Sequence, residues 1–282
     1  MLNASREALA LLPPDLSAAA EGKILCAEEL RLRTGRKLTA LIRASEIQLG
    51  ERAVTQGDIY RVVEKATGAS AHTALSGIAS GYISCRAGLR IGLCGTGFGD
   101  AGLRDISSLA IRIPHDVRDC GSAVADKIIA NYMNNILILS PPGGGKTTFA
   151  RECVRVLSHN GVRVCVADER GEIAAVSGGE PQFELGESVD VMSNVPKARA
   201  AMMMLRSMAP QVIVMDEISS PADAEAVQCA SGCGVGVIAT AHAASTGDLS
   251  ARPAYRALSG MFSGAVIIKN RLGERSYSWE AL

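Results

Sequence analysis

Apolar residues in the second half of the chain form short continuous runs, separated by longer segments in which they recur every three or four positions. The runs predict strands buried on both faces, and the spaced segments predict amphipathic helices. The predicted strands are residues 136–139, 162–167, 212–215 and 236–240, and the predicted helices are 147–158, 196–208 and 222–231. This alternation is typical of a parallel sheet covered by helices on both faces. Residues 265–269 and 275–279 flank Leu272 and Gly273 and predict an edge hairpin.

The first part of the chain has a different pattern. Residues 58–66 have helical spacing, whereas the segments that begin at Leu89 and Ser108 alternate between apolar and polar positions and predict half-exposed strands. A mixture of this kind predicts an α+β fold. We therefore expect a smaller α+β domain over residues 1–118, followed by an α/β domain over residues 119–282.

The sequence SPPGGGKTT, residues 140–148, connects the first predicted strand of the second domain to its first helix. Backbone N–H groups of such a loop wrap phosphates, and the helix N-terminus adds its dipole. Lys146 supplies a positive charge, and the Thr147 hydroxyl can ligate Mg²⁺. The pattern predicts ATP and Mg²⁺ binding, the alternative being a glycine-rich connection with an incidental lysine. The predicted nucleotide-binding residues are Pro142, Gly143, Gly144, Gly145, Lys146, Thr147 and Thr148.

Two adjacent acids, Asp216 and Glu217, follow the predicted strand 212–215 directly. The carboxyl ends of parallel strands meet at the edge where such sheets bind ligands. We expect Asp216 to hold Mg²⁺, directly or through water, and Glu217 to act as the general base that polarises the attacking water. The alternative is that the two acids only cap the following helix.

Two more groups follow neighbouring predicted strands. The sequence DERGE, residues 168–172, follows the strand 162–167 and contains Glu169 and Glu172, whose carboxylates can orient water or hold Mg²⁺. The alternative is a salt-bridged turn. His242 follows the strand 236–240 and can sense the γ-phosphate or bridge to Glu217. A lone histidine is otherwise an ordinary loop residue.

The order of these motifs resembles the Walker A, Asp box, Walker B and His box of the secretion-superfamily ATPases that drive type II and type IV machinery. The chain is more closely similar to the stage III sporulation protein AA family. Four segments carry that likeness: LRLRTGRK from Leu30, VADERGEI, MMMLRSM and DEI. The resemblance covers nearly the whole chain. It implies a RecA-like P-loop ATPase domain and hydrolysis of ATP to ADP and phosphate.

The resemblance also implies a homo-hexameric ring with nucleotide between subunits. An arginine of the neighbouring N-terminal domain then reaches the γ-phosphate, because its planar fork spreads charge over phosphate oxygens. Arg112 is the first candidate, ahead of Arg90 and Arg104, and the alternative is that all three only face solvent. By the same resemblance the partners are membrane proteins of the sporulation channel between mother cell and forespore.

Composition restricts the remaining classes. The 282 residues carry 29 Lys plus Arg and 29 Asp plus Glu, so no net charge steers the chain to nucleic acid or to a membrane surface. The basic run of Arg31, Arg33, Arg36 and Lys37 has no interleaved aromatic residue for base stacking. A contact with another domain or subunit is favoured over nucleic acid.

The length of the apolar stretches in the sequence indicates where the protein is located. Residues 8–12 form too short a run for a signal peptide, and no stretch approaches the roughly 18 apolar residues of a membrane span. We expect a cytoplasmic protein, held at the membrane only through protein partners and not inserted directly.

Two residue choices depart from the resembled pattern. Ser140 stands where GxxxxGK[ST] has its first glycine, so the strand has to turn without a residue that is free at positive φ. Residues 209–211 (APQ) stand where these ATPases usually have an acidic residue.

The leading hypothesis is an ATP-driven motor. The alternatives are an ATP-gated scaffold with negligible turnover and a RecA-like nucleic-acid motor.

Overall fold

The computed structural model describes residues 3–43, 45–68, 70, 79, 81–97, 102–250, 260–271 and 274–282. Contacts between Cα atoms divide the chain into two compact units, Met1–His115 and Asp116–Leu282. The division lies close to the boundary between residues 118 and 119 that the sequence suggests.

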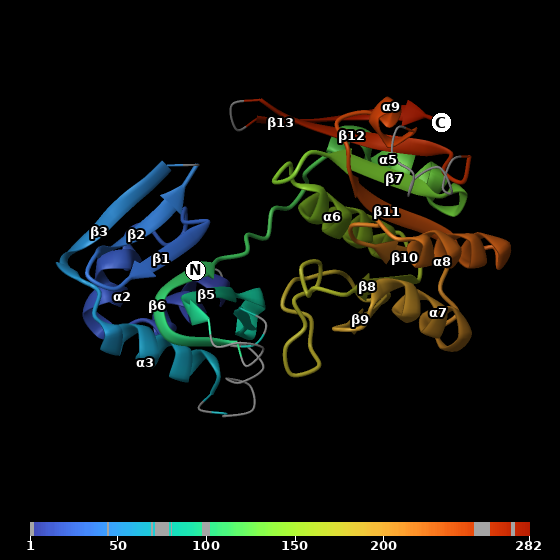
Figure 1. Ribbon diagram of the computed structural model, residues 1–282. Coiled ribbons are helices and arrows are strands. Elements are labelled where there is room, and N and C mark those ends of the chain that lie inside the picture. The colour runs from blue at the N-terminus through green and yellow to red at the C-terminus, as the bar shows by residue number, and fades with distance from the viewer. Residues whose placement is uncertain are drawn as a thin grey trace. The chain divides into compact units, whose positions relative to one another are not determined.

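Among its described residues, the first unit combines the helices α1, α2 and α3 with an antiparallel sheet (Figure 1). Its sheet has the strand order β3-β2-β1-β6-β5-β4. The elements are α1 (Asn3–Leu11), α2 (Pro14–Glu21), β1 (Glu29–Arg33), β2 (Lys37–Ile42), β3 (Ser45–Ala53), α3 (Gln56–Ala66), β4 (Tyr82–Ser84), β5 (Arg90–Gly97) and β6 (Leu103–Arg112), with a short 3₁₀ turn at Arg86–Gly88.

Alternation along β1 separates the core of this unit from its polar face. Leu30 and Leu32 are fully buried in the apolar core of this unit, whereas Arg31 and Arg33 lie on the opposite face. Arg31 pairs with Glu29, Arg33 with Glu46, and Lys37 Nζ lies 3.0 Å from Glu51 Oε2. Much of the charge of the basic run is therefore balanced by carboxylates of its own sheet.

The second unit is an α/β domain with a seven-stranded sheet in the order β13-β12-β7-β11-β10-β8-β9. Among the described strands, five neighbouring pairs are parallel, and β12 and β13 form an antiparallel hairpin. The strands are β7 (Ile136–Ser140), β8 (Val164–Asp168), β9 (Val189–Ser193), β10 (Val212–Met215), β11 (Gly236–His242), β12 (Gly264–Arg271) and β13 (Glu274–Ala281). The helices are α5 (Ser122–Asn131), α6 (Lys146–His159), α7 (Lys197–Ser207), α8 (Pro221–Gly232) and α9 (Thr246–Ser250), with a 3₁₀ turn at Tyr132–Asn134.

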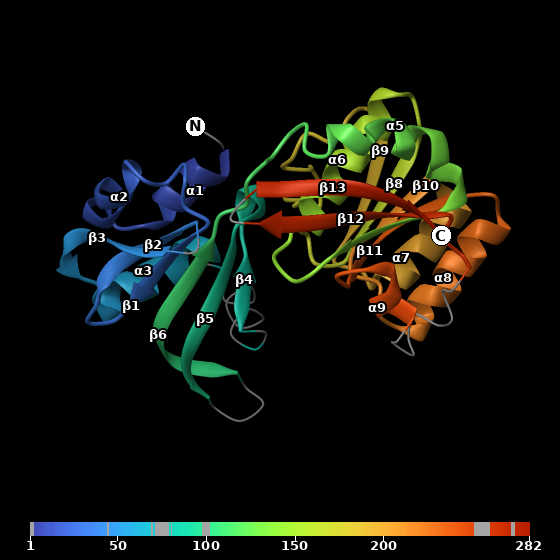
Figure 2. The same cartoon turned by 90° about the horizontal axis from the view of Figure 1, so that it is seen from above.

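The side chains of the continuous apolar strands pack into two cores, one on each face of this sheet. In β7, Ile136 and Ile138 pack with α5 and α6, whereas Leu137 and Leu139 pack with α7 and α8. The other central strands divide their side chains in the same way, since successive side chains point to opposite faces. Figure 2 shows the two helical layers on either side of the sheet. Every apolar position of the central strands is therefore used, as the unbroken runs predict.

The edge strands β3 and β9 carry little apolar signal in the sequence. The strand β9 lies at the sheet edge and is only half-buried, and β3 at the edge of the first sheet is mostly exposed. Edge strands lack the apolar runs that reveal central strands, because one side of each faces solvent. The predicted hairpin is present, but its strands are longer than the apolar segments, and Leu272 and Gly273 lie outside the described residues.

Candidate functional site

The phosphate loop lies between the end of β7 and the start of α6. Gly143 has φ +71° and Gly145 has φ +101°, a region that L-residues with side chains rarely adopt. Gly145 is the N-cap of α6 and has no side chain to occupy the helix end. The first N–H groups of the 14-residue helix are therefore free of a side-chain cap and available to an anion.

Ser140 shows how the loop turns without its usual first glycine. It remains in β7 and is not among the described residues that have a positive φ, so the turn begins only after it. Its buried hydroxyl donates to the Pro141 carbonyl at 3.0 Å. A Cβ on Gly144 would lie 1.5 Å from Ser140 Oγ. The serine side chain thus fills the space that faces Gly144, and the glycine requirement falls on position 144.

Lys146 is buried at the base of the loop. Its ammonium donates to the carbonyl oxygens of Ser140 and Pro141 at 3.0 and 3.2 Å, and to His242 Nδ1 at 2.9 Å. Burial lowers the pKa of Lys146, and the nearby carboxylates of Asp216, Glu217 and Glu172 oppose that shift. A desolvated ammonium of this kind gains from a full negative charge such as a phosphate.

Asp216 and Thr147 meet at the carboxyl end of β10. Thr147 Oγ1 donates to Asp216 Oδ2 at 2.9 Å, and the Thr240 hydroxyl of β11 donates to Asp216 Oδ1. A threonine hydroxyl and a carboxylate are the hard oxygen ligands that Mg²⁺ takes, together with water and substrate phosphates. These two side chains therefore fit a Mg²⁺ site, with Thr240 orienting the carboxylate.

Glu217 has a strained backbone and a fixed side chain. Its φ is +52°, uncommon for a residue other than glycine, and its N–H donates to Thr240 Oγ1 at 2.7 Å. Its carboxylate pairs with Arg170 and lies 3.1 Å from His242 Nε2. Strained backbone of this kind concentrates at functional sites, so the conformation supports a working role for Glu217.

His242 connects Lys146 to Glu217. Because Lys146 is a donor only, the His242 Nδ1 that faces it at 2.9 Å has to accept. In a neutral imidazole the proton then lies on Nε2, which faces Glu217 Oε1 at 3.1 Å. The structure thus brings Lys146, Thr147, Asp216, Glu217 and His242 together at one edge of the sheet.

The three acids of the DERGE segment lie in different surroundings. Asp168 is buried, and its carboxylate accepts backbone N–H bonds from Glu172, Ile173 and Ala174 at 2.8 to 3.1 Å. Burial raises the pKa of Asp168, and those bonds oppose the shift. Glu169 is held by Lys197 of α7, Oε2 to Nζ 2.9 Å, a contact that lowers its pKa. The charge of the third acid, Glu172, opposes the lowering of the pKa of Lys146.

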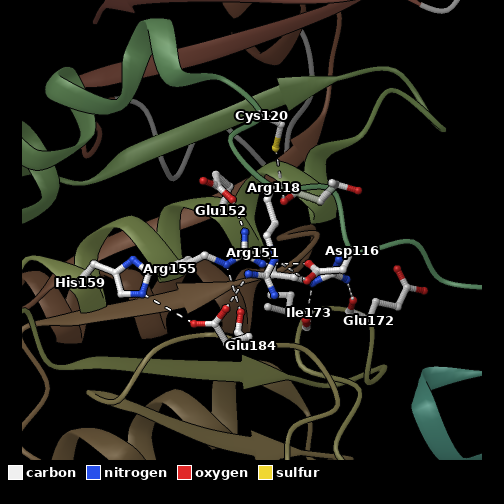
Figure 3. A network of polar contacts seen from close by, with 11 residues as sticks. Asp116, Arg118, Cys120, Arg151, Glu152, Arg155, His159, Glu172, Ile173 and Glu184 are labelled. Atoms are coloured by element: carbon white, nitrogen blue, oxygen red, sulfur yellow. Dashed lines mark hydrogen bonds and ion pairs between the residues drawn. The ribbon is translucent and has the colours of Figure 1, made fainter. Parts of the chain in front are cut away.

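Two arginines of α6, Arg151 and Arg155, form a polar network with neighbouring segments of the chain (Figure 3). Arg151 is buried and donates from Nε to the Ile173 carbonyl and from Nη2 to the Glu172 carbonyl, both at 2.7 Å. Burial lowers the pKa of Arg151 to about 10. Arg155 pairs with Glu152 and, at 2.8 Å, with Asp116. Arg151 therefore fixes the backbone that carries Glu172.

Replacing Arg151 by methionine is expected to destabilise this unit by about 3 kcal/mol, because two buried carbonyls lose their charged donor. Methionine retains much of the apolar stem. The midpoint of urea unfolding measures the effect, with Arg206→Met on the exposed surface of α7 as the matched control. Equal midpoints for the two variants would show that Arg151 does not hold the segment.

The three arginine candidates for trans contact all belong to the first unit. Arg112 ends β6, is 69% exposed, and its Nε lies 3.6 Å from Glu29 Oε2. Arg90 lies over the Tyr82 ring at 3.9 Å, and Arg104 lies 3.7 Å from Asp105. Arg112 is thus well exposed to reach another chain.

Sequence reasoning missed several residues of this site. Thr240 supports both acids, Arg170 pairs with Glu217, and Arg151 holds the Glu172 backbone. Thr240 ends the predicted strand 236–240, two positions before His242, and Arg170 lies inside the DERGE segment. No local pattern indicates which partner a threonine or an arginine will find across a sheet.

The family model described as "Sporulation stage III, protein AA" matches residues 19–275 of the chain. The stage III sporulation protein AA of Bacillus subtilis (strain 168) is 36% identical over 253 residues, covering 86% of this chain and 82% of that protein. The family predicted from the motifs is therefore confirmed.

Solved structures extend the comparison to the fold. The ATPase DotB of Legionella pneumophila matches with a TM-score of 0.66 at 17% identity, covering 95% of this chain and 79% of DotB. The pilus retraction motor PilT with bound ADP matches with a TM-score of 0.68 at 16% identity, covering 95% of this chain and 82% of PilT. The predicted fold class, a RecA-like α/β domain preceded by an α+β domain, is confirmed. Among the described residues, no helix has the length and apolar character needed to cross a bilayer.

Proposed function

The chain belongs to the sporulation stage III protein AA family, and from that premise we propose that it is an ATP-hydrolysing motor of a ring assembly. The observation that supports this proposal is a row of contacts at the sheet edge, in which Lys146 contacts His242 and His242 contacts Glu217, each at hydrogen-bond distance. The contact of Thr147 with Asp216 lies beside it. A phosphate loop alone would only bind; these acids add the means to hydrolyse.

The proposed chemistry assigns each side chain one task. Backbone N–H groups of residues 143–148 and the Lys146 ammonium bind the phosphates, and Thr147 and Asp216 hold Mg²⁺. Bound Mg²⁺ would neutralise charge that develops on the phosphate oxygens. Glu217 takes a proton from the attacking water, and His242 orients Glu217 through its Nε2–H. Glu172 is a further candidate to orient water, while Glu169, tied to Lys197, would have to leave that contact to do so.

Assembly completes the proposal. Relatives in fold include PilT, a pilus retraction motor whose structure holds ADP. We infer a homo-hexamer in which Arg112 of one subunit reaches the nucleotide of the next, so that binding closes adjacent subunits and hydrolysis releases them. The motion would be delivered to membrane proteins of the sporulation channel between mother cell and forespore, with the chain itself in the cytoplasm.

Sedimentation and phosphate release together test the motor. With ATP and Mg²⁺ we expect a discrete larger species and steady phosphate production; Arg112→Ala should lower turnover while ATP binding by the single subunit persists, since its role is in trans. Arg206→Ala on α7 is the matched control. A ring without phosphate release would favour an ATP-gated scaffold. Hydrolysis that depends on tight, salt-sensitive binding of single-stranded nucleic acid would favour a nucleic-acid motor.

A further inference from the structure

The C-terminal hairpin continues past the strand that carries the phosphate loop. Strand β12 is paired with β7 up to Ile267 opposite Leu139, near the point where β7 ends. The hairpin itself remains paired beyond that position, past Asn270 opposite Arg275 to Arg271 opposite Glu274. Its outer part therefore lies past the carboxyl edge of the sheet, which is the edge where the phosphate loop begins.

Alternation along β13 determines which side chains turn toward α6. Tyr277 and Trp279 pack against the core that lies under α5 and α6, and the Tyr277 ring centroid is 5.0 Å from that of Phe149 in α6. Arg275 shares their face, because it lies two positions before Tyr277 in the same strand. The strand thus directs Arg275 toward the N-terminal end of α6.

Arg275 lies directly against the phosphate loop. A Cβ on Gly145 would be 2.9 Å from Arg275 Nε and 3.5 Å from its Cζ. Gly145 is the N-cap of α6 and the residue before Lys146, so the guanidinium stands beside the loop's last turn. Position 145 needs glycine on two counts: its φ of +101° and the arginine packed against it.

Three sources of positive potential converge here: the Arg275 guanidinium, the Lys146 ammonium and the N-terminal end of the α6 dipole. Asp216 and Glu217 contact Thr147, Thr240, His242 and Arg170, and their charges also act on Lys146. Within the part of the chain that the structure describes, Arg275 has no carboxylate partner, and its side chain is exposed. Such a concentration of positive charge suits a polyanion.

We propose that Arg275 is a phosphate-binding residue of its own subunit, donated by the C-terminal hairpin and distinct from any arginine supplied by a neighbour. The inference rests on the proposed nucleotide site. The backbone N–H groups of a phosphate loop cradle the α- and β-phosphates, whereas the loop lysine reaches the β- and γ-phosphates. Beside Gly145, Arg275 contacts the part of the nucleotide that ATP and ADP share.

The test compares nucleotide affinities of single variants by titration calorimetry. Arg275→Ala is expected to weaken ATP and ADP binding alike, by about 10- to 100-fold, the effect of losing a charged donor to phosphate. Arg275→Lys keeps the charge without the planar fork and should lose less. Lys269→Ala is the matched control: Lys269 pairs with Ser276 on the opposite face of the same hairpin and should leave both affinities unchanged.

The outcomes separate this inference from the proposed function. Wild-type binding with equal affinities in Arg275→Ala overturns the role of Arg275 and leaves the ATPase proposal standing. A loss confined to ATP overturns the assignment to the shared phosphates. A folded wild-type chain that binds neither nucleotide overturns both proposals.

Discussion

Replacing Glu217 by glutamine is expected to lower the ATP turnover number by about 100- to 10,000-fold, the range for loss of a general base. Glutamine keeps the size of the side chain and can still hydrogen-bond to Arg170 and His242, so the loop and Lys146 remain in place. ATP affinity should therefore stay within about threefold of the wild-type value. The variant would hold ATP without consuming it.

Phosphate release and equilibrium ATP binding measure the two halves of this prediction. Glu225→Gln on the exposed surface of α8 is the matched control, since it makes the same chemical change away from the site. If Glu217→Gln turned over ATP at the wild-type rate while folded, Glu217 would not be the base. Glu172→Gln would then be the next variant to assay, because the Glu172 carboxylate also acts on Lys146 and Glu172 is a further candidate to orient water.

Replacing Lys146 by alanine is expected to weaken ATP binding by about 10- to 100-fold, as a charged donor to the phosphates is lost. Turnover at saturating ATP should fall by a further factor of about 100 to 1,000, because the same ammonium stabilises charge that develops in the transition state. His242 also loses the donor to its Nδ1, which removes the reason for its proton to stay on Nε2. Binding and chemistry therefore fail together.

Lys127→Ala on the exposed surface of α5 serves as the control for removal of one positive charge. Thermal unfolding of both variants shows whether the loss of ATP binding reflects the site or the fold, since Lys146 is buried and bonded to two loop carbonyls. A folded Lys146→Ala protein with wild-type affinity and turnover would contradict the assignment of residues 140–148 as the phosphate loop.

Much of the fold was predictable because the local sequence patterns match the burial and the backbone conformations that the tertiary structure requires. Unbroken apolar runs in β7, β8, β10 and β11 reflect burial on both faces, and the glycines before Lys146 reflect a turn that needs positive φ. The edge strands β3 and β9 were not predicted, because half-exposed segments carry little apolar signal. Ser140 was expected to hinder the turn, yet it stays in the strand and the turn begins after it.

The sequence by itself determined the chemistry present at the sheet edge: a lysine and threonine after a glycine loop, two acids after one strand and a histidine after another. Parallel strands deliver their carboxyl ends to one edge, so motif order already implies proximity. Only the tertiary structure decided which atoms meet. Thr240 reaches Asp216 from the next strand, Lys146 fixes the tautomer of His242, and Arg275 lies against Gly145. These contacts depend on strand order and register, which bring together residues far apart in the chain and leave no local pattern in it.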